Sequence, residues 1–174
     1  MADISAVFGI LLFLGIAFPG MLTAWYLLFP ATVERARLRF DRTPWQCFFV
    51  GGVITAILTI PIVILFALHN GVTQFMGWVI IFAILTIASI GAAGIAAKMG
   101  ERLAARSGGN LSPAAAFVRG AIALELAAAF PILGWFIIIP LAIVTALGAT
   151  AFALLRWMPR TVTQVVANNT VPQA

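Results

Sequence analysis

Residues 45–68 read WQCFFVGGVITAILTIPIVILFAL, an apolar run without a charged side chain. At a helical rise of about 1.5 Å per residue, this run is long enough to cross the roughly 30 Å hydrocarbon core of a bilayer. A second uncharged run at residues 74–97, QFMGWVIIFAILTIASIGAAGIAA, follows after a short connection at residues 69–73. Spans joined so closely form an antiparallel helical hairpin. The two runs therefore predict a membrane fold built from helices.

The composition of the whole chain supports this prediction. Of the 174 residues, 63% are apolar and 9% are charged, whereas soluble domains have about 45–50% and about 25%. A chain of this length cannot bury so much apolar surface in one water-soluble core. We therefore predict an all-α integral membrane bundle with a single domain over residues 1–157. The composition excludes a soluble enzyme, a disordered chain, a disulfide scaffold and a nucleic-acid-binding protein.

One more clear span and one broken apolar region complete the pattern. Residues 4–29 are uncharged, and the Pro19-Gly20 step within them is expected to kink or loosen the helix. Residues 113–155 are too long for a single crossing, and residues 131–134 (PILG) interrupt them. Residues 158–174 are polar and are expected to form a flexible or partner-docked tail.

The broken region has two possible arrangements. In the first, residues 113–130 lie at the membrane interface or enter it part-way, and residues 135–155 cross alone. In the second, both segments form a hairpin that turns between Pro131 and Gly134. The chain has four spans in the first arrangement and five in the second.

The positions of lysine and arginine bear on this choice. The turn at residues 69–73 has none, and most of them lie in two other loops: Arg35, Arg37, Arg39 and Arg42 in the first, Lys98, Arg102, Arg106 and Arg119 in the second. By the positive-inside rule both loops are cytoplasmic and the N-terminus is outside. A hairpin also returns Arg156 and Arg160, and hence the C-terminus, to the cytoplasm. We therefore favour the hairpin, although it places Arg119 and Glu125 in its first helix.

Glu125 is the one acid deep within an apolar segment. An unpaired carboxylate in lipid costs several kcal/mol, so this side chain should face protein, water, a cation or the interface. A proton or cation site is the functional interpretation. Arg119 precedes it by six residues, a spacing that does not pair side chains on one helical face. We favour a structural or interfacial role.

His69 is the only histidine and the candidate ligand for a pigment or haem. It lies beside Asn70 and Gly71 at the end of an apolar run, where Gly71 suits the left-handed position that ends many helices. This place favours a solvated residue at a helix end. We therefore predict no cofactor and no metal, and a lone Cys47 adds no disulfide.

Residues 32–40, TVERARLRF, predict a short basic helix with Val33, Ala36 and Phe40 on another side. Such a helix can rest on anionic headgroups, with about 1 kcal/mol for each arginine. The expected anionic-lipid contacts are Arg35, Arg37, Arg39 and Arg42. The simpler alternative is a loop that sets topology without a specific lipid.

Small residues recur at helical spacing in two apolar runs, where they let helices approach closely. The predicted packing residues are Ser89, Ala93 and Ala97 in the third run and Ala142, Ala146 and Ala149 in the last. The predicted hinge or turn residues are Pro19, Gly20, Pro131 and Gly134.

Several weak motifs occur in an order that resembles a known family. Phe29-Pro30, a short basic helix and the Arg42-Thr43-Pro44 step resemble the start of a small bacterial multi-span membrane module. A small-residue-rich helix with a basic end at residues 90–102, PILGW at residues 131–135 and LGA at residues 147–149 follow in the same order. The module is often fused to, or encoded beside, bactofilin-type polymer-forming domains, and this chain shows no such domain. The resemblance covers residues 28–157, and it implies architecture and a bacterial inner membrane but no activity.

The chain shows no phosphate loop, nucleophile elbow or clustered metal ligands. We therefore predict a non-enzymatic accessory or scaffold subunit of a larger respiratory or photosynthetic membrane complex. Its expected partners are the bilayer, other membrane subunits and anionic lipid, and not nucleic acid. One alternative is a small channel or transporter that uses Glu125 and the broken helices. Another is a membrane anchor for a bactofilin-like filament.

Overall fold

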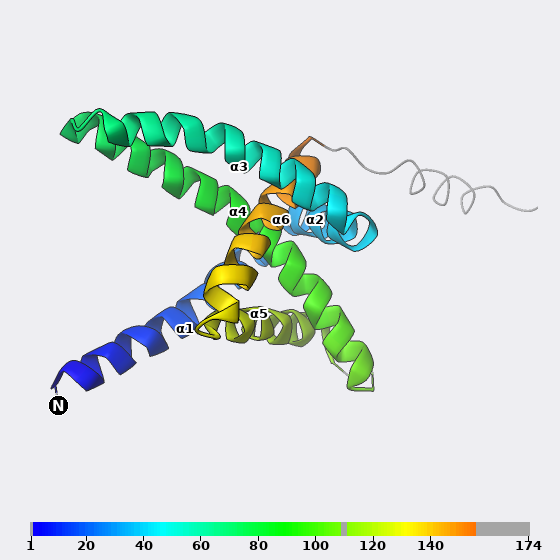
Figure 1. Cartoon of the computed structure of the whole chain (residues 1–174). Helices are drawn as coiled ribbons and strands as arrows, with labels where there is room; N and C mark the ends of the chain where they lie inside the picture. Colours follow the sequence, from blue (N-terminus) through cyan, green and yellow to red (C-terminus); the bar gives the residue numbers. More distant parts are fainter. Residues whose placement is uncertain (1, 109–110, 156–174) are drawn as a thin grey trace, which may run out of the picture.

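The computed structural model describes the backbone of residues 2–108 and 111–155 and the side chains of residues 15–108 and 111–155. This part of the chain is a bundle of helices, which confirms the predicted all-α fold (Figure 1). The predicted tail at residues 158–174, together with Arg156 and Arg160, lies outside the described residues. The elements are α1 (Ala2–Leu28), α2 (Pro30–Arg42), α3 (Pro44–Ala67), α4 (Gly71–Arg106), α5 (Pro113–Ala129), the π-helical turn η1 (Gly134–Ile138) and α6 (Ile139–Leu154).

Three of the described helical segments are long and apolar enough to cross a bilayer. They are α3, α4 and the segment Gly134–Leu154, which η1 and α6 form together. The part of α1 from Gly15 counts with α2 as a fourth only if this bent pair is one broken span. Helix α5 is not among them, because its 17 residues extend about 26 Å, less than the roughly 30 Å of hydrocarbon.

Helices α1 and α2 meet at an angle of 107°. Phe29, between them, has φ −129° and ψ 55°, because the following Pro30 disfavours a helical conformation at the residue before it. Helix α1 itself continues through Pro19 and Gly20. The break in this part of the chain is therefore at Phe29, ten residues beyond the step where we expected a kink.

Helices α3 and α4 form the predicted hairpin with a tight turn. Asn70 caps α4, since its side-chain oxygen accepts a hydrogen bond of 3.4 Å from the backbone N–H of Val72. The prediction that Gly71 takes the left-handed position was wrong. His69 adopts it, with φ 47°, because the Asn70 cap makes Gly71 the first residue of α4.

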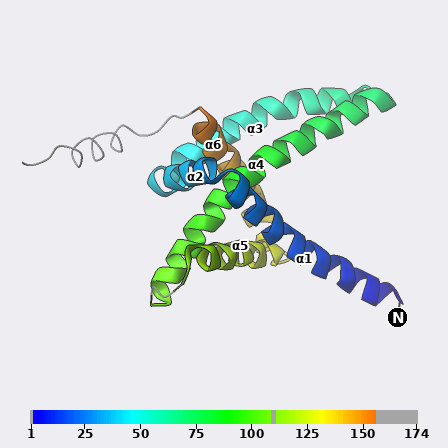
Figure 2. The same cartoon turned by 180° about the vertical axis from the view of Figure 1, so that it is seen from behind.

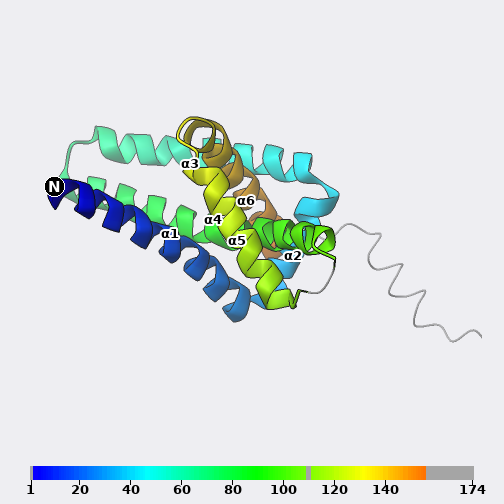
Figure 3. The ribbon, with the colours of Figure 1, turned by 90° about the horizontal axis from the view of Figure 1, so that it is seen from below.

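The packed core lies where the second half of α1 meets α2, α4, α5 and α6, and the start of α3 joins it through buried Cys47 (Figure 3). The helices come closest where glycines face a neighbouring backbone. Gly51 of α3 lies against the backbone of α6, and Gly148 of α6 lies against that of α3, so that a Cβ at either position would overlap with a carbonyl oxygen. Gly100 and Gly120 bring α4 and α5 together in the same way. These close approaches replace the hydrophobic drive that lipid removes.

The outer part of the α3–α4 hairpin, residues 57–82, extends away from the other described helices, and we call it the arm (Figures 1 and 2). The two helices of the arm are separated by a small groove of about 130 Å³, lined in part by Thr59, Ile62 and Ile81. Nearer the turn the two helices are in close contact, since a Cβ at Gly77 would lie 2.9 Å from the ring of Phe66.

Residues 130–133 form the turn between α5 and the last helical segment. Pro140 lies at the start of α6, directly after η1. Proline lacks an N–H, and its ring crowds the carbonyl four residues earlier in an α-helix. The wider π turn just before it relieves that conflict. Residues 113–155 thus form two helices with a turn, as both predicted arrangements require, and only the second helix has spanning length.

Candidate functional site

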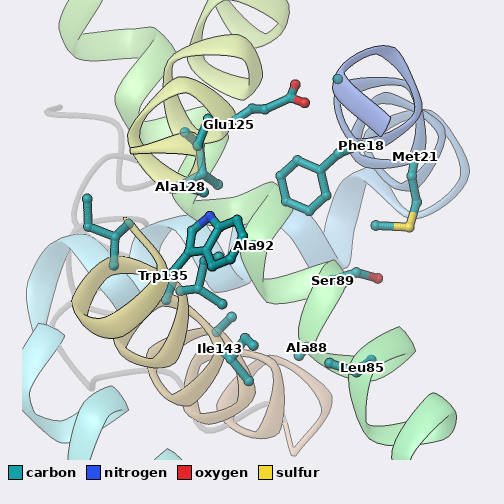
Figure 4. Close-up of a pocket in the computed structure, with 17 residues that line it drawn as sticks. Phe18, Met21, Leu85, Ala88, Ser89, Ala92, Glu125, Ala128, Trp135 and Ile143 are labelled. Atoms are coloured by element: carbon teal, nitrogen blue, oxygen red, sulfur yellow. The ribbon is translucent and has the colours of Figure 1, made fainter. Parts of the chain in front are cut away.

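An apolar cavity of about 500 Å³ lies between α1, α4, α5 and the η1–α6 segment, and it is partly open (Figure 4). Its walls consist mostly of alanine, leucine and isoleucine side chains from these four elements. The polar or aromatic side chains that line it are Phe18, Ser89, Glu125 and Trp135. The cavity is therefore apolar, and Glu125 is the one ionisable residue among those that line it.

Glu125 projects from α5 toward α1, and the ring of Phe18 lies beside it, while Trp135 lines the cavity from the η1 side (Figure 4). A Cβ at Gly15 of α1 would stand 3.4 Å from Oε1 of Glu125. This distance is an ordinary van der Waals contact, so Gly15 places the backbone of α1 directly beside the carboxylate. Arg119, on the same helix, is exposed and forms no ion pair with Glu125. Among the described residues, Glu125 has no ion-pair or hydrogen-bond partner.

None of the four predicted hinge or turn residues lines this cavity, although residues next to some of them do. The η1 turn lines it through Trp135, and α1 lines it through Phe18, the residue before Pro19. Gly134 is buried, and a Cβ there would overlap with the carbonyl of Ala128 in α5. Pro131, Pro19 and Gly20 do not line the cavity.

A second group of charged side chains joins α2 to the end of α4, and we call it the charged cluster. Arg37 pairs with Glu34 and Glu101. The Nζ atom of Lys98 lies 3.0 Å from Asp41 and 3.1 Å from Glu101. The cluster therefore fastens α2 to α4 by contacts between residues far apart in the sequence.

This cluster lies beyond the apolar part of α4. The helix has 36 residues, about 54 Å, and its uncharged crossing stretch ends before Lys98. The hydrogen bond from Lys98, helped by the charge of Arg37, holds the pKa of Glu101 below its ordinary value despite some desolvation.

The four arginines predicted to contact anionic lipid do not behave alike. Arg37 is committed to the charged cluster, and Arg39 donates a 3.0 Å hydrogen bond to Gln46 and lies with its guanidinium carbon 4.1 Å from the ring centre of Phe152. Arg37 and Arg39 therefore contact other side chains of the protein. Arg35 is half-buried and Arg42 is exposed.

His69 is exposed at the α3–α4 turn, and its Nδ1 donates a hydrogen bond to the carbonyl oxygen of Ala67. Within the described residues no group of three or more histidine, cysteine, aspartate or glutamate side chains could hold a metal ion. The structure thus gives His69 a local role in the turn.

The predicted packing residues lie in or beside the core. Ser89, Ala93, Ala146 and Ala149 are buried, and Ala97 and Ala142 are partly buried. The prediction missed the glycines that make the closest contacts, of which Gly51, Gly91, Gly94 and Gly148 face a neighbouring helix. Their signal in the sequence was a glycine set among larger apolar residues, which does not say which neighbour it faces.

The long apolar helices, short turns and buried small residues define a multi-pass integral membrane protein. No family model, curated protein or solved structure matches the chain. The resemblance to the bactofilin-associated membrane module therefore stays a prediction.

Proposed function

We propose that this protein is a non-catalytic accessory subunit of a larger assembly in a bacterial inner membrane, and that the arm docks against another membrane protein. The observation that carries the proposal is the difference in burial between the spans. In the most apolar 18-residue stretch of α3, 6% of the residues are buried, whereas 44% are buried in the corresponding stretch of the Gly134–Leu154 segment. This stretch of α3 is thus almost wholly exposed, although the start of the helix packs on α6.

The exposed side chains of the arm are large and follow helical spacing. They include Ile57, Ile60 and Ile64 on one helix and Phe75, Val79 and Phe82 on the other. Three aromatic rings also contact one another, with centroids 5.7 Å apart between Phe66 and Trp78 and 6.2 Å apart between Trp78 and Phe82. Such aromatic surfaces are enriched at the centres of protein interfaces, which supports a protein partner over lipid alone.

Native mass measurement after gentle detergent extraction tests the proposal. We expect the parent protein to carry at least one other membrane subunit, and Trp78→Ala to lose it. The matched control is Leu126→Ala, which removes an exposed apolar side chain of α5 outside the arm. A stable monomer, or an oligomer of this chain alone, would contradict the accessory role.

The same proposal places α2 and the charged end of α4 on the cytoplasmic side, supported by the basic residues gathered there. Cysteine labelling from either side of the membrane tests this orientation in a Cys47→Ser background. A cysteine at Ala105 should react only from the cytoplasm and one at Asn70 only from outside. The reverse pattern would overturn the orientation.

A small transporter is a second candidate, because the cavity brings Glu125 together with the η1 turn and α1. Reconstituted vesicles should then show a proton or cation flux that Glu125→Gln abolishes. Absence of flux in the parent protein, or normal flux in the variant, counts against transport.

A further inference from the structure

We propose that the cavity between α1, α4, α5 and the η1–α6 segment binds a small lipophilic ammonium, with its positive nitrogen at the carboxylate of Glu125. This inference rests on the cavity alone. It holds whether or not the arm docks a partner, and a static binding site without flux satisfies it.

The charges around the cavity select the sign of the ligand. Glu125 is the single charged residue among those that line it, and no lysine, arginine or histidine is present there. A carboxylate in apolar surroundings without a partner costs free energy. A cationic nitrogen would supply the missing partner, whereas an anionic ligand would meet only like charge.

The remaining walls select the body of the ligand. The rings of Phe18 and Trp135 line the same cavity as Glu125 (Figure 4), and aromatic faces attract a cationic nitrogen. Alanine, leucine and isoleucine side chains of α4, α5 and the η1–α6 segment form most of the remaining wall and suit an alkyl or aromatic body.

The size of the cavity favours a small molecule. Its volume of about 500 Å³ falls within the roughly 300–1,000 Å³ of sites that enclose small ligands. One carboxylate cannot hold a bare metal ion, and no cluster of metal ligands occurs among the described residues. The occupant we assign is therefore a single-chain amine that enters from the bilayer.

Photolabelling of the purified protein in phosphatidylcholine nanodiscs tests this assignment. The probe is a dodecylamine with a diazirine in its chain, and the comparison probe is the corresponding dodecanol. Peptide mapping should place amine adducts on the segments of α5 and η1–α6 that line the cavity, about ten-fold above those of the alcohol. Glu125→Gln should lower the amine labelling to the level of the alcohol.

Two further variants separate ligand binding from folding. Glu34→Gln makes the same change at an acid that does not line the cavity, and it should leave amine labelling unchanged. Gly15→Leu should crowd the carboxylate and reduce amine labelling even with Glu125 intact. Thermal unfolding of each variant shows whether the fold is retained.

Three outcomes would overturn the inference. The first is equal labelling by the amine and the alcohol, which would mean that the site takes a neutral amphiphile. The second is undiminished amine labelling in folded Glu125→Gln. The third is competition by phosphatidylethanolamine as effective as that by unlabelled dodecylamine, which would assign the cavity to a bilayer lipid.

Discussion

The packed core and the arm both contain strongly apolar helices, yet the core is buried and the arm is exposed. In the core, glycine and alanine let backbones approach, and Ala93, Ala96 and Ala149 are fully buried. In the arm, isoleucine, valine and phenylalanine point outward. Because lipid is as apolar as these side chains, hydrophobicity cannot decide which surface is inside. The difference indicates that glycine and alanine mark the helix faces that pack closely in this protein.

The largest effect should come from adding one methyl group in the core. Gly51→Ala places a Cβ on a backbone carbonyl of α6, so α3 and α6 must separate. We expect a loss of about 3 kcal/mol in the free energy of unfolding. The control is Gly52→Ala, because nothing lies within 4 Å of a Cβ at Gly52. Titration with denaturing detergent measures both, and equal losses would contradict the close approach.

Removing an aromatic ring should destabilise the protein in the core but not in the arm. Phe117 is 3% exposed and stacks on Tyr26, with ring centroids 4.3 Å apart. Phe117→Ala should lower the free energy of unfolding by about 2 kcal/mol, because it leaves a cavity in the core. The loss is moderate because lipid solvates the ring in the unfolded state. Phe82 is 63% exposed, and Phe82→Ala should change the stability of the isolated protein by less than about 0.5 kcal/mol. Thermal unfolding in detergent checks the pair, and similar losses would mean that the arm is buried within the chain.

A smaller effect is expected for a hydrogen bond between helices. The buried hydroxyl of Thr150 donates to the carbonyl oxygens of Ala146 (2.9 Å) and Ile87 (3.1 Å), the second on a different helix. Thr150→Val keeps the volume and should cost about 1 kcal/mol. Thr86→Val is the control, because its exposed hydroxyl bonds only within α4. A loss at Thr86 as large as that at Thr150 would show that the contact between helices adds nothing.

The smallest effect concerns the charged cluster at the edge of the core. Since the pKa of Glu101 is lower in the folded protein, its contribution is complete above the unfolded value of about 4.3 and is lost as the pH falls through the lowered folded value. Its side chain is 51% exposed, so we expect a change below about 2 °C in the unfolding midpoint. The midpoints of the parent and Glu101→Gln should converge between pH 7 and pH 3. A constant difference would contradict this role.

The helices could be predicted from the sequence because long apolar runs end at proline or charge. The predicted spans at residues 45–68 and 113–130 differ from α3 and α5 by at most one residue at each end. The contacts between helices could not be predicted in this way. Arg37 and Glu101 are 64 residues apart, and no local pattern relates them.

The candidate site shows the same limit. Glu125 stood out because an acid is rare in an apolar segment. Its surroundings did not, since Gly15, Phe18 and Trp135 come from other elements and each fits an ordinary membrane helix. The partners of Arg37 and Arg39 could not be predicted for a related reason, because Glu101 and Phe152 lie far along the chain, and the contact of both arginines with anionic lipid stays a prediction.

The 107° bend at Phe29 also bears on the order in which contacts form during synthesis. Helix α2 packs on α4 and α6, but its partner Glu101 is made 64 residues after Arg37. At about 5–20 residues per second, the ribosome needs roughly 3 to 13 seconds to supply that partner. The bend at Phe29 depends on Pro30, which directly follows it, and not on residues made later. The contacts of α2 with α6, by contrast, can form only after the last described helix has been made.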